Sequence, residues 1–352
     1  MTAPAETHDT GRRPGFFRRR RGDRGLAANP RARAEALTAY FFIAPYLLIT
    51  VVFTVGVIVF AAYVSFTRFN LFTSPEWVGF DNYTKAFGDA KFIRSLVNVF
   101  WYVIIVVPAQ TVLALFLASL LNVKVRGSRF FRTIFYAPSV TSSVVITMIF
   151  FWLYLKTGYI NLAFTKLWAL FGAEFQAIEW LNNTVGLFQG IARAFGGDIS
   201  SDFWYLRGPS VTWMAIMFQN IFTTAPTFMI MFLAALQDVP PGLYEAASID
   251  GATKRRQFQH ITVPMLRPVI LLVVVLGTIG TWQIFDQVKI LTAGGPLNTT
   301  LTPVFLIFSE ALGTVGPPRM GFASAMAFML AVIIFAFTLI QRRYIERGTE
   351  MY

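Results

Sequence analysis

Cysteine is absent from the chain, and histidine occurs only twice, at His8 and His260. Without thiols there is no disulfide and no thiolate chemistry. Two histidines so far apart in the sequence are too few for a zinc site. We therefore expect no metal and no cofactor.

Nucleotide-binding and hydrolytic motifs are missing too. A phosphate-cradling loop of the form G-x-x-x-x-G-K-[ST] is not present, because no lysine follows a glycine and precedes serine or threonine. With His260 as the only histidine beyond the N-terminal tail, a Ser/His/Asp arrangement is not expected either. We predict that the chain is not an enzyme and hydrolyses no nucleotide itself.

Charged residues are scarce, at 14% of the sequence, whereas soluble domains carry about 25%. Hydrophobic residues make up 55% and come in continuous, non-alternating blocks, which favours membrane helices over a barrel.

A spanning helix needs about 20 apolar residues. Six segments free of Asp, Glu, Lys and Arg satisfy this, the fifth only if it continues past Asp286 towards Leu291: Ala36–Thr67, Ser95–Val123, Thr133–Leu155, Gly208–Gln237, Pro268–Phe285 and Gly321–Gln341. The predicted fold is all-α, a polytopic membrane protein with six transmembrane helices. The shorter run Tyr159–Phe171 is interpreted as an interfacial helix.

The cations lie mainly on one side of this arrangement. Six spans place both termini on the same side, and 20 of the 30 lysines and arginines fall in the tails and loops of that side. An excess of cations marks the cytoplasmic side. We therefore predict cytoplasmic termini, a six-span domain at 36–344 with a cytoplasmic loop at 238–264 and an outer loop at 156–208, and a cytoplasmic tail at 345–352.

Residues 1–35 contain the run "GRRPGFFRRRRGDRG" and are predicted to be a disordered basic tail. The arginines suit anionic membrane lipid head groups. The simpler interpretation is a charge block that fixes topology. The net charge of +12 does not lead us to expect nucleic acid as a partner, because its distribution already follows the membrane topology.

The cytoplasmic stretch "YEAASIDGATKRRQFQHITVPMLRP" runs from Tyr244 to Pro268 between two apolar segments. Its pattern predicts a short helix that ends at Asp250-Gly251, where glycine permits a positive φ. Thr253 is expected to cap a second helix that runs to about Ile261, before Pro264. Such a helix–turn–helix would project from the membrane with Glu245 and three cations at its tip.

These residues resemble the EAA loop of bacterial ABC importer permeases. The matching positions are Glu245, Ala246, Ala247, Gly251, Ile261 and Pro264. Val263 stands where the family usually has leucine. In that family the loop sits in a cleft of the ATPase subunit, so the resemblance implies that these six residues couple the chain to ATP hydrolysis on another subunit. The competing interpretation is an ordinary amphipathic connector.

Further motifs extend the resemblance over about Phe41–Tyr344. They are "VGFDNYTKAF", "SRFFRTIFYAPSV", "TGYIN", "LTAGGPLNTT" and "GFASAMAF". Together they are similar to carbohydrate-importer permeases of the maltose and glycerol-phosphate type, within which "LYEAASIDGA" resembles the maltose F-type partner. The basic tail and an apparent insertion at about Val185–Arg207 fall outside the resemblance.

The resemblance implies a bacterial inner-membrane location and several partners. These are a second homologous permease subunit, two copies of a cytoplasmic ATP-binding subunit and an extracytoplasmic solute-binding protein. It also implies a sugar pathway between the permease subunits.

Two helix faces are candidates for contacting the sugar. Asn220, Thr223, Thr224 and Thr227 share one face of the fourth span at offsets 0, 3, 4 and 7. Polar side chains in hydrocarbon face the bundle interior or a wet cavity. The fifth span repeats the same spacing with Gly277, Gly280, Thr281 and Ile284. Aligned on the EAA and GGP motifs, both faces match the family's substrate-contact positions. Helix packing through small and hydroxyl residues is the competing interpretation.

Two alternative functions remain open at this point. An importer of glycerol-phosphate or another polyol derivative would keep the architecture, but a phosphate favours a cation, and spans four and five carry none outside the cytoplasmic loop. That favours a neutral di- or oligosaccharide. A membrane scaffold or signalling protein would use the same loop to hold a cytoplasmic partner, and the polar faces argue against it.

Overall fold

The structure is a computed structural model that describes residues 30–122, 127–314 and 316–346. Residues 1–29, most of the predicted disordered tail, lie outside this range, as do residues 347–352 of the C-terminal tail. The chain divides into two compact units, Met1–Val59 and Phe60–Tyr352. The described part of the first unit is helix α1 (Pro30–Ile49), the π-helical segment η2 (Thr50–Gly56) and the start of α2 (Val57–Ser65). Because α1 begins at Pro30, the last residues of the predicted tail are helical.

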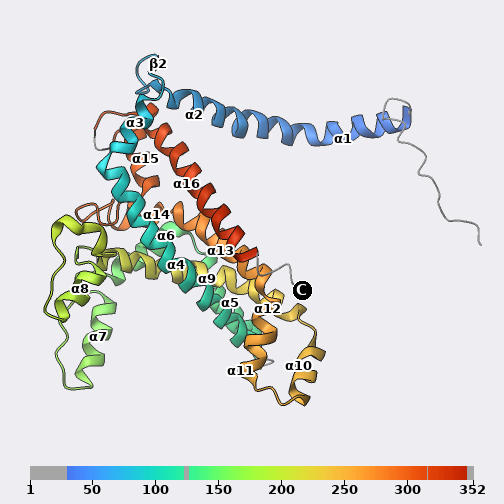
Figure 1. Ribbon diagram of the computed structural model, residues 1–352, viewed down its shortest axis with the longest axis vertical. Helices are drawn as coiled ribbons and strands as arrows, with labels where there is room; N and C mark the ends of the chain where they lie inside the picture. Colours follow the sequence, from blue (N-terminus) through green and yellow to red (C-terminus); the bar gives the residue numbers. More distant parts are fainter. Residues whose placement is uncertain (1–29, 123–126, 315, 347–352) are drawn as a thin grey trace, which may run out of the picture. The chain divides into compact units, whose positions relative to one another are not determined.

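The second unit is built around four long helices, α4 (Ala90–Leu121), α9 (Val211–Asp238), α13 (Arg267–Trp282) and α16 (Met320–Glu346). Helix α4 packs along α9 and α13, and α13 also packs against α16 (Figure 1). Tyr102, Trp213 and Trp282 are large members of the core between them. Asp89 and Ser210 start α4 and α9 by accepting hydrogen bonds from the first free backbone N–H groups.

The remaining elements of the second unit are short. They are β1 (Thr67–Arg68), β2 (Glu76–Trp77), α3 (Asp81–Gly88), α5 (Ser128–Val140), α6 (Ser143–Leu153), α7 (Tyr159–Ala169), α8 (Leu187–Ala194), the 3₁₀ segment η3 (Ser201–Leu206), α10 (Pro241–Ile249), α11 (Lys254–Gln257), the π segment η4 (Phe258–Thr262), α12 (Val263–Met265), α14 (Asp286–Leu291) and α15 (Pro303–Leu312). The two strands pair antiparallel, with Thr67 opposite Trp77. The described chain is thus mostly helical, with two short strands, which confirms the predicted fold class.

Within the described residues, five helices are long and apolar enough to cross a membrane: Ala34–Ser65, Ala90–Leu121, Val211–Asp238, Arg267–Leu291 and Met320–Arg343. They correspond to predicted spans one, two, four, five and six. The fifth reaches Leu291 through α14, as the sequence required. Helix α15 was not predicted as an element, and its 10 residues are too few to span.

The third predicted span, Thr133–Leu155, is not one straight helix. Helix α5 ends at Val140, and α6 starts at Ser143 with its axis bent by 94°. Thr141 and Ser142 between them adopt extended backbone angles. Serine and threonine favour such non-helical conformations, and Pro138 has already removed one backbone donor from the last turn of α5. The third span was predicted from the length of its charge-free run, and that length contains no information about a bend.

Several of the motifs quoted above have structural roles in the second unit. Asn82 of "VGFDNYTKAF" donates to the carbonyls of Ser65, the last residue of α2, and Thr67, the first residue of β1. The last carbonyls of a helix have no partner within that helix. Gly321 of "GFASAMAF" lies against the same segment, since a Cβ there would sit 1.9 Å from the Thr67 oxygen. Asn161 of "TGYIN" is buried and donates to the Lys156 and Ile178 carbonyls while accepting from the Ile178 N–H and the Trp180 indole.

The predicted topology is testable because the chain has no cysteine of its own. Lys254 and Asn182 are both exposed, and in the sequence Asn182 precedes α9 whereas Lys254 follows it. In Lys254→Cys the thiol is expected to react with a membrane-impermeant maleimide only from the cytoplasmic side, and in Asn182→Cys only from outside. The reverse labelling pattern in right-side-out and inverted vesicles would contradict the six-span topology.

Candidate functional site

The helix–turn–helix predicted from "YEAASIDGATKRRQ" is present between α9 and α13. Helix α10 ends at Ile249, and Gly251 follows with φ of +75°. A Cβ at Gly251 would meet no atom within 4 Å, so the glycine is required by its backbone conformation and not by crowding. Thr253 caps α11 by accepting from the Arg256 N–H. We call Pro241–Pro264 the coupling loop, after the role that the sequence resemblance implies.

After α11, the helix boundaries in the structure differ from those predicted from the sequence. The second helix was expected to end near Ile261 because Pro264 lacks an N–H. Instead α11 spans only Lys254–Gln257 and passes into the π segment Phe258–Thr262, and helical backbone continues through Pro264 to α13. A wider π turn lets the chain continue past a proline whose ring would clash with the carbonyl four residues earlier in a regular helix. The coupling loop is therefore joined to α13 by continuous helical backbone.

Gln257 holds the two halves of the coupling loop together, and sequence reasoning did not single it out. Its side chain is buried, and its amide donates to Ser248 Oγ at 2.8 Å and to the Ala252 carbonyl at 3.2 Å. A second link joins Tyr244 Oη and Thr262 Oγ1 at 2.9 Å. A glutamine flanked by cations in a polar stretch carries no sequence signal for burial. These hydrogen bonds hold α10 against the segment from Gln257 to Thr262.

The tip of the coupling loop is open to a partner. Glu245 and Ala246 are exposed, and Ala247 is half-buried. Ile249 leaves 87% of its surface exposed, which is unusual for an isoleucine beside charged residues. None of the ion pairs among the described residues involves Glu245 or the exposed cations Lys254, Arg255 and Arg256. Ile261 and Pro264 are half-buried at the base.

The predicted polar face of α9 is only partly covered. Asn220, Thr223 and Thr224 are half-buried, and Thr227 is exposed. The side-chain hydrogen bonds of this face lie within the helix: Thr223 donates to the Gln219 carbonyl at 3.1 Å and Thr224 to Asn220 Oδ1 at 3.4 Å. Adjacent Gln219, in contrast, is fully buried and donates to Thr147 Oγ1 of α6 at 2.7 Å. The face from Asn220 to Thr227 is thus partly accessible, as is another side of α9, where Phe218 and Phe222 are exposed.

The four positions predicted on the fifth span divide into two environments, and the last of them, Ile284, lies just beyond the end of α13 at Trp282. Gly277, Thr281 and Ile284 are buried within the subunit, whereas Gly280 is exposed and a Cβ there would meet nothing within 4 Å. The room left by Gly277 is occupied by Gln110 of α4, whose Nε2 would lie 2.5 Å from a Cβ. Both amide atoms of Gln110 are buried without a hydrogen-bond partner among the described residues. Helical spacing alone cannot reveal this neighbour, because it comes from another helix.

We expect Gly277→Val to destabilise the subunit, because the added methyl groups meet Gln110 and Phe228 in a filled space. Overpacking of this kind typically costs about 1–3 kcal/mol. The measurement is the thermal unfolding midpoint of the detergent-solubilised chain. Shortening the neighbour in Gln110→Ala should restore part of the loss. If the double variant is no more stable than Gly277→Val alone, the packing contact is not what requires glycine.

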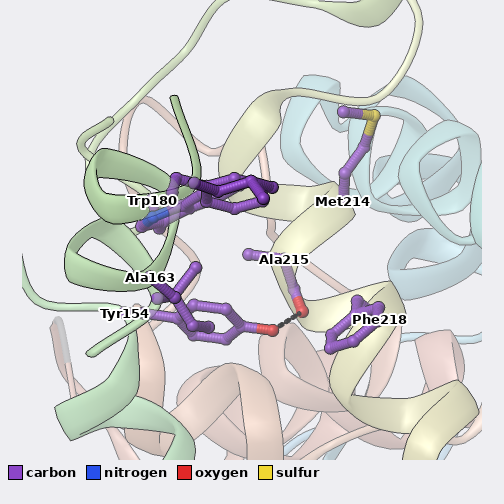
Figure 2. A pocket seen from close by; sticks show the side chains of 9 residues that line it. Tyr154, Ala163, Trp180, Met214, Ala215 and Phe218 are labelled. Atoms are coloured by element: carbon purple, nitrogen blue, oxygen red, sulfur yellow. Dashed lines mark hydrogen bonds between the residues drawn. The ribbon is translucent and has the colours of Figure 1, made fainter. Parts of the chain in front are cut away.

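An apolar cavity of about 470 Å³ lies elsewhere, between α7, Trp180 and the start of α9 (Figure 2). Its lining includes Tyr154, Phe164, Met214 and Phe218. The Tyr154 hydroxyl points to α9 and donates to the Ala215 carbonyl at 2.7 Å. A sugar needs convergent polar groups as well as apolar surface, and the one side-chain hydroxyl here is already engaged. This cavity is therefore not a candidate sugar site.

Comparison with known proteins adds three findings. The family model described as "Binding-protein-dependent transport system inner membrane component" matches residues 110–349. The probable ABC transporter permease protein YesP of Bacillus subtilis (strain 168) is 34% identical over 88% of this chain and 90% of its own length. The arabinooligosaccharides transport system permease protein AraP of the same organism is 32% identical over 86% of each chain.

A solved structure shows the same fold. One chain of a bacterial ABC transporter involved in the import of the acidic polysaccharide alginate superimposes with a TM-score of 0.68, covering 90% of this chain and 98% of that one at 20% identity. Another structure of the alginate ABC transporter, in complex with an alginate pentasaccharide-bound periplasmic protein, gives a TM-score of 0.67.

Proposed function

This chain belongs to the family of binding-protein-dependent transport system inner membrane components, and we propose that it forms one half of the membrane pathway of an ATP-driven importer for a di- or oligosaccharide. The observation that carries the proposal is the coupling loop: a rigid helix–turn–helix with an exposed apolar and charged tip, continuous with α13. The chain is a membrane component, and ATP hydrolysis belongs to separate subunits.

The cargo class rests on relatives and on the absence of charge. Relatives named for arabinooligosaccharides and for trehalose and maltose match more than four-fifths of the chain. Between Gly208 and Phe285, lysine and arginine occur only in the coupling loop and at Arg267, the first residue of α13. A phosphorylated cargo would favour a cation in this region. A neutral sugar is therefore preferred over glycerol-phosphate or another polyol derivative.

The sugar would be contacted by the accessible members of the two predicted faces. These are Asn220, Thr223, Thr224 and Thr227 on α9 and Gly280 on α13. Gly277, Thr281 and Ile284 would act by fixing the position of α13 against α4. In this arrangement hydroxyl and amide groups bind sugar hydroxyls, and movement of α13 changes the geometry of the face.

In the coupling loop, Glu245, Ala246, Ala247 and Gly251 would seat in a cleft of the ATP-binding subunit, with Ile261 and Pro264 at the base transmitting its movement to α13. Small alanines let another surface approach closely, and Ile249 adds apolar area that this chain leaves uncovered. The full assembly would comprise a second homologous permease, two ATP-binding subunits and an extracytoplasmic solute-binding protein, with both termini of this chain in the cytoplasm.

Co-purification tests this proposal. A tagged chain solubilised from its native membrane should bring with it a second permease and two copies of an ATP-binding subunit, as determined by native mass spectrometry. ATP hydrolysis by that complex should rise when a sugar-loaded solute-binding protein is added. Recovery of a kinase or a lone adaptor in place of an ATP-binding subunit would instead support a scaffold.

A further inference from the structure

The segment at about 185–207, the apparent insertion of the sequence analysis, is closed tightly at its base. Val211 N–H donates to the Val185 carbonyl at 3.0 Å, and Phe188 N–H donates to the Arg207 carbonyl at 3.1 Å. Gly186 permits this approach, since a Cβ there would sit 2.2 Å from the Arg207 oxygen. The closure fixes Arg207 immediately before α9.

Arg207 thereby shares a small polar cavity with Arg94, from the first turns of α4. The cavity holds about 90 Å³ and is also lined by Asn98, Trp204, Ser210 and Thr299. Arg94 stacks on the Trp204 ring, 5.2 Å from its centroid. The Nε atoms of both arginines are sealed from solvent and have no hydrogen-bond partner among the described residues. Neither arginine takes part in an ion pair within that part of the chain.

Both arginines are half-buried, and an anion that enters the cavity would stabilise this arrangement. Two like charges facing one cavity repel each other, and a buried N–H without an acceptor leaves its desolvation uncompensated. The side-chain nitrogen of Asn98 donates to the Asn298 and Leu301 carbonyls, both at 2.9 Å, which fixes the position of this side chain at the cavity wall. A carboxylate accepts from guanidinium groups in a planar, charge-assisted geometry that satisfies both.

The size of the cavity limits what carries the carboxylate. Sites for whole small molecules are about 300–1,000 Å³, several times the volume here, so a sugar ring does not fit and the end of a side chain does. Phe203, Tyr205 and Leu206 beside the cavity are 50%, 44% and 51% exposed. Aromatic residues and arginine are enriched in protein–protein interfaces.

The position of the cavity indicates which partner can reach it. It lies at the N-terminal end of α9, and the coupling loop follows the C-terminal end of the same 28-residue helix, about 42 Å away. The cavity and the coupling loop therefore belong to opposite sides of the membrane. A partner on the far side from the ATP-binding subunit is the solute-binding protein.

We propose that Arg94 and Arg207 form a carboxylate-binding site that receives an acidic side chain of the solute-binding protein when it docks. The assignment rests on the proposed importer function. Trp204 orients the Arg94 guanidinium, and the exposed aromatic residues of η3 surround the contact. The 185–207 segment thus serves as a docking element.

The test is the affinity of a solute-binding protein for the assembled complex in nanodiscs, measured by surface plasmon resonance. The binding protein used is one that stimulates ATP hydrolysis by the wild-type complex. Arg94→Gln and Arg207→Gln should each weaken docking at least tenfold and reduce its salt dependence. In the double variant, the fold-loss of docking affinity should be smaller than the product of the two single fold-losses, because both arginines share one carboxylate.

Arg193→Gln is the matched control, since it removes an equal charge from the same insertion. Arg193 is already paired with Asp198 at 3.2 Å, and its hydrogen bond together with that of Gln189 lowers the pKa of Asp198 to about 2. Docking of this variant should change less than twofold. Co-purification of the ATP-binding subunit verifies that each variant assembles.

The experiment is run with the solute-binding protein unliganded, loaded with a neutral oligosaccharide, and loaded with an oligosaccharide containing a uronic acid. Weakened docking in all three states supports the proposal. Weakening confined to the uronate-loaded state would assign the carboxylate to the cargo and overturn it, and so would normal docking by the assembled double variant. If no binding protein stimulates even the wild-type complex, the importer function itself has failed.

Discussion

Replacing Gly251 by proline is expected to abolish ATP-driven sugar uptake while the chain remains assembled in the membrane. Proline fixes φ near −65°, whereas Gly251 has φ of +75°. The turn between α10 and α11 cannot form with that residue, so the tip no longer fits its partner. The measurements are ATP-dependent uptake and binding-protein-stimulated ATP hydrolysis by the reconstituted complex. Full uptake by Gly251→Pro would remove the turn from the coupling mechanism.

A matched pair of alanine substitutions isolates the backbone effect. A Cβ at Gly242 or at Gly251 meets no atom within 4 Å, but only Gly251 has a positive φ. Gly251→Ala therefore introduces about 1–2 kcal/mol of left-handed backbone strain, and uptake should fall severalfold. Gly242→Ala should transport normally. Equal activity of the two variants would show that the positive φ is not needed for coupling.

The second large effect is expected for Asn220→Leu, which should lower transport tenfold to hundredfold with assembly intact. Loss of a hydrogen-bonding amide leaves sugar hydroxyls unpaired in a partly dry site, at about 1–3 kcal/mol. Uptake into proteoliposomes, normalised to assembled complex, is the measurement. Basal ATP hydrolysis should persist, because the coupling loop is unchanged.

The adjacent Gln219 supplies the contrast for this prediction. Its side chain is fully buried and bonded to Thr147 of α6, so Gln219→Leu should lower the yield of assembled complex instead of transport per complex. Thr212, on the same helix, is also held by other residues, because its hydroxyl donates to the Asn183 carbonyl and accepts from the Asn183 N–H. Undiminished transport by Asn220→Leu would exclude Asn220 from the sugar path.

The features that the sequence predicts correctly are those governed by local chemistry. Long charge-free runs are enough to identify five continuous spans, because a helix in lipid must satisfy its own backbone and cover itself with apolar side chains. Gly251 is equally readable, since a glycine between two short helical patterns marks a left-handed turn. The cap at Thr253 follows from the same local rules.

Features that depend on a distant neighbour were not predictable. Spacing placed Gly277 on the same face as Gly280, yet Gln110 of α4 fills the space beside the first and leaves the second open. Gln257 is buried only because α10 folds back over it. Arg94 and Arg207 meet across a closed insertion that composition does not reveal. In each case the environment of the residue is set by a side chain or backbone group from another element of the fold.

The most direct test of the central claim is ATP-dependent sugar accumulation by proteoliposomes that contain this chain with its co-purified permease and ATP-binding subunits. A panel of labelled di- and oligosaccharides is supplied with the solute-binding protein on one side and ATP on the other. We predict that at least one neutral sugar accumulates, and that Gly251→Pro in an equally assembled complex abolishes this accumulation. Sugar accumulation that continues unchanged in Gly251→Pro, or ATP hydrolysis stimulated by the binding protein with no sugar of the panel transported, would contradict the account.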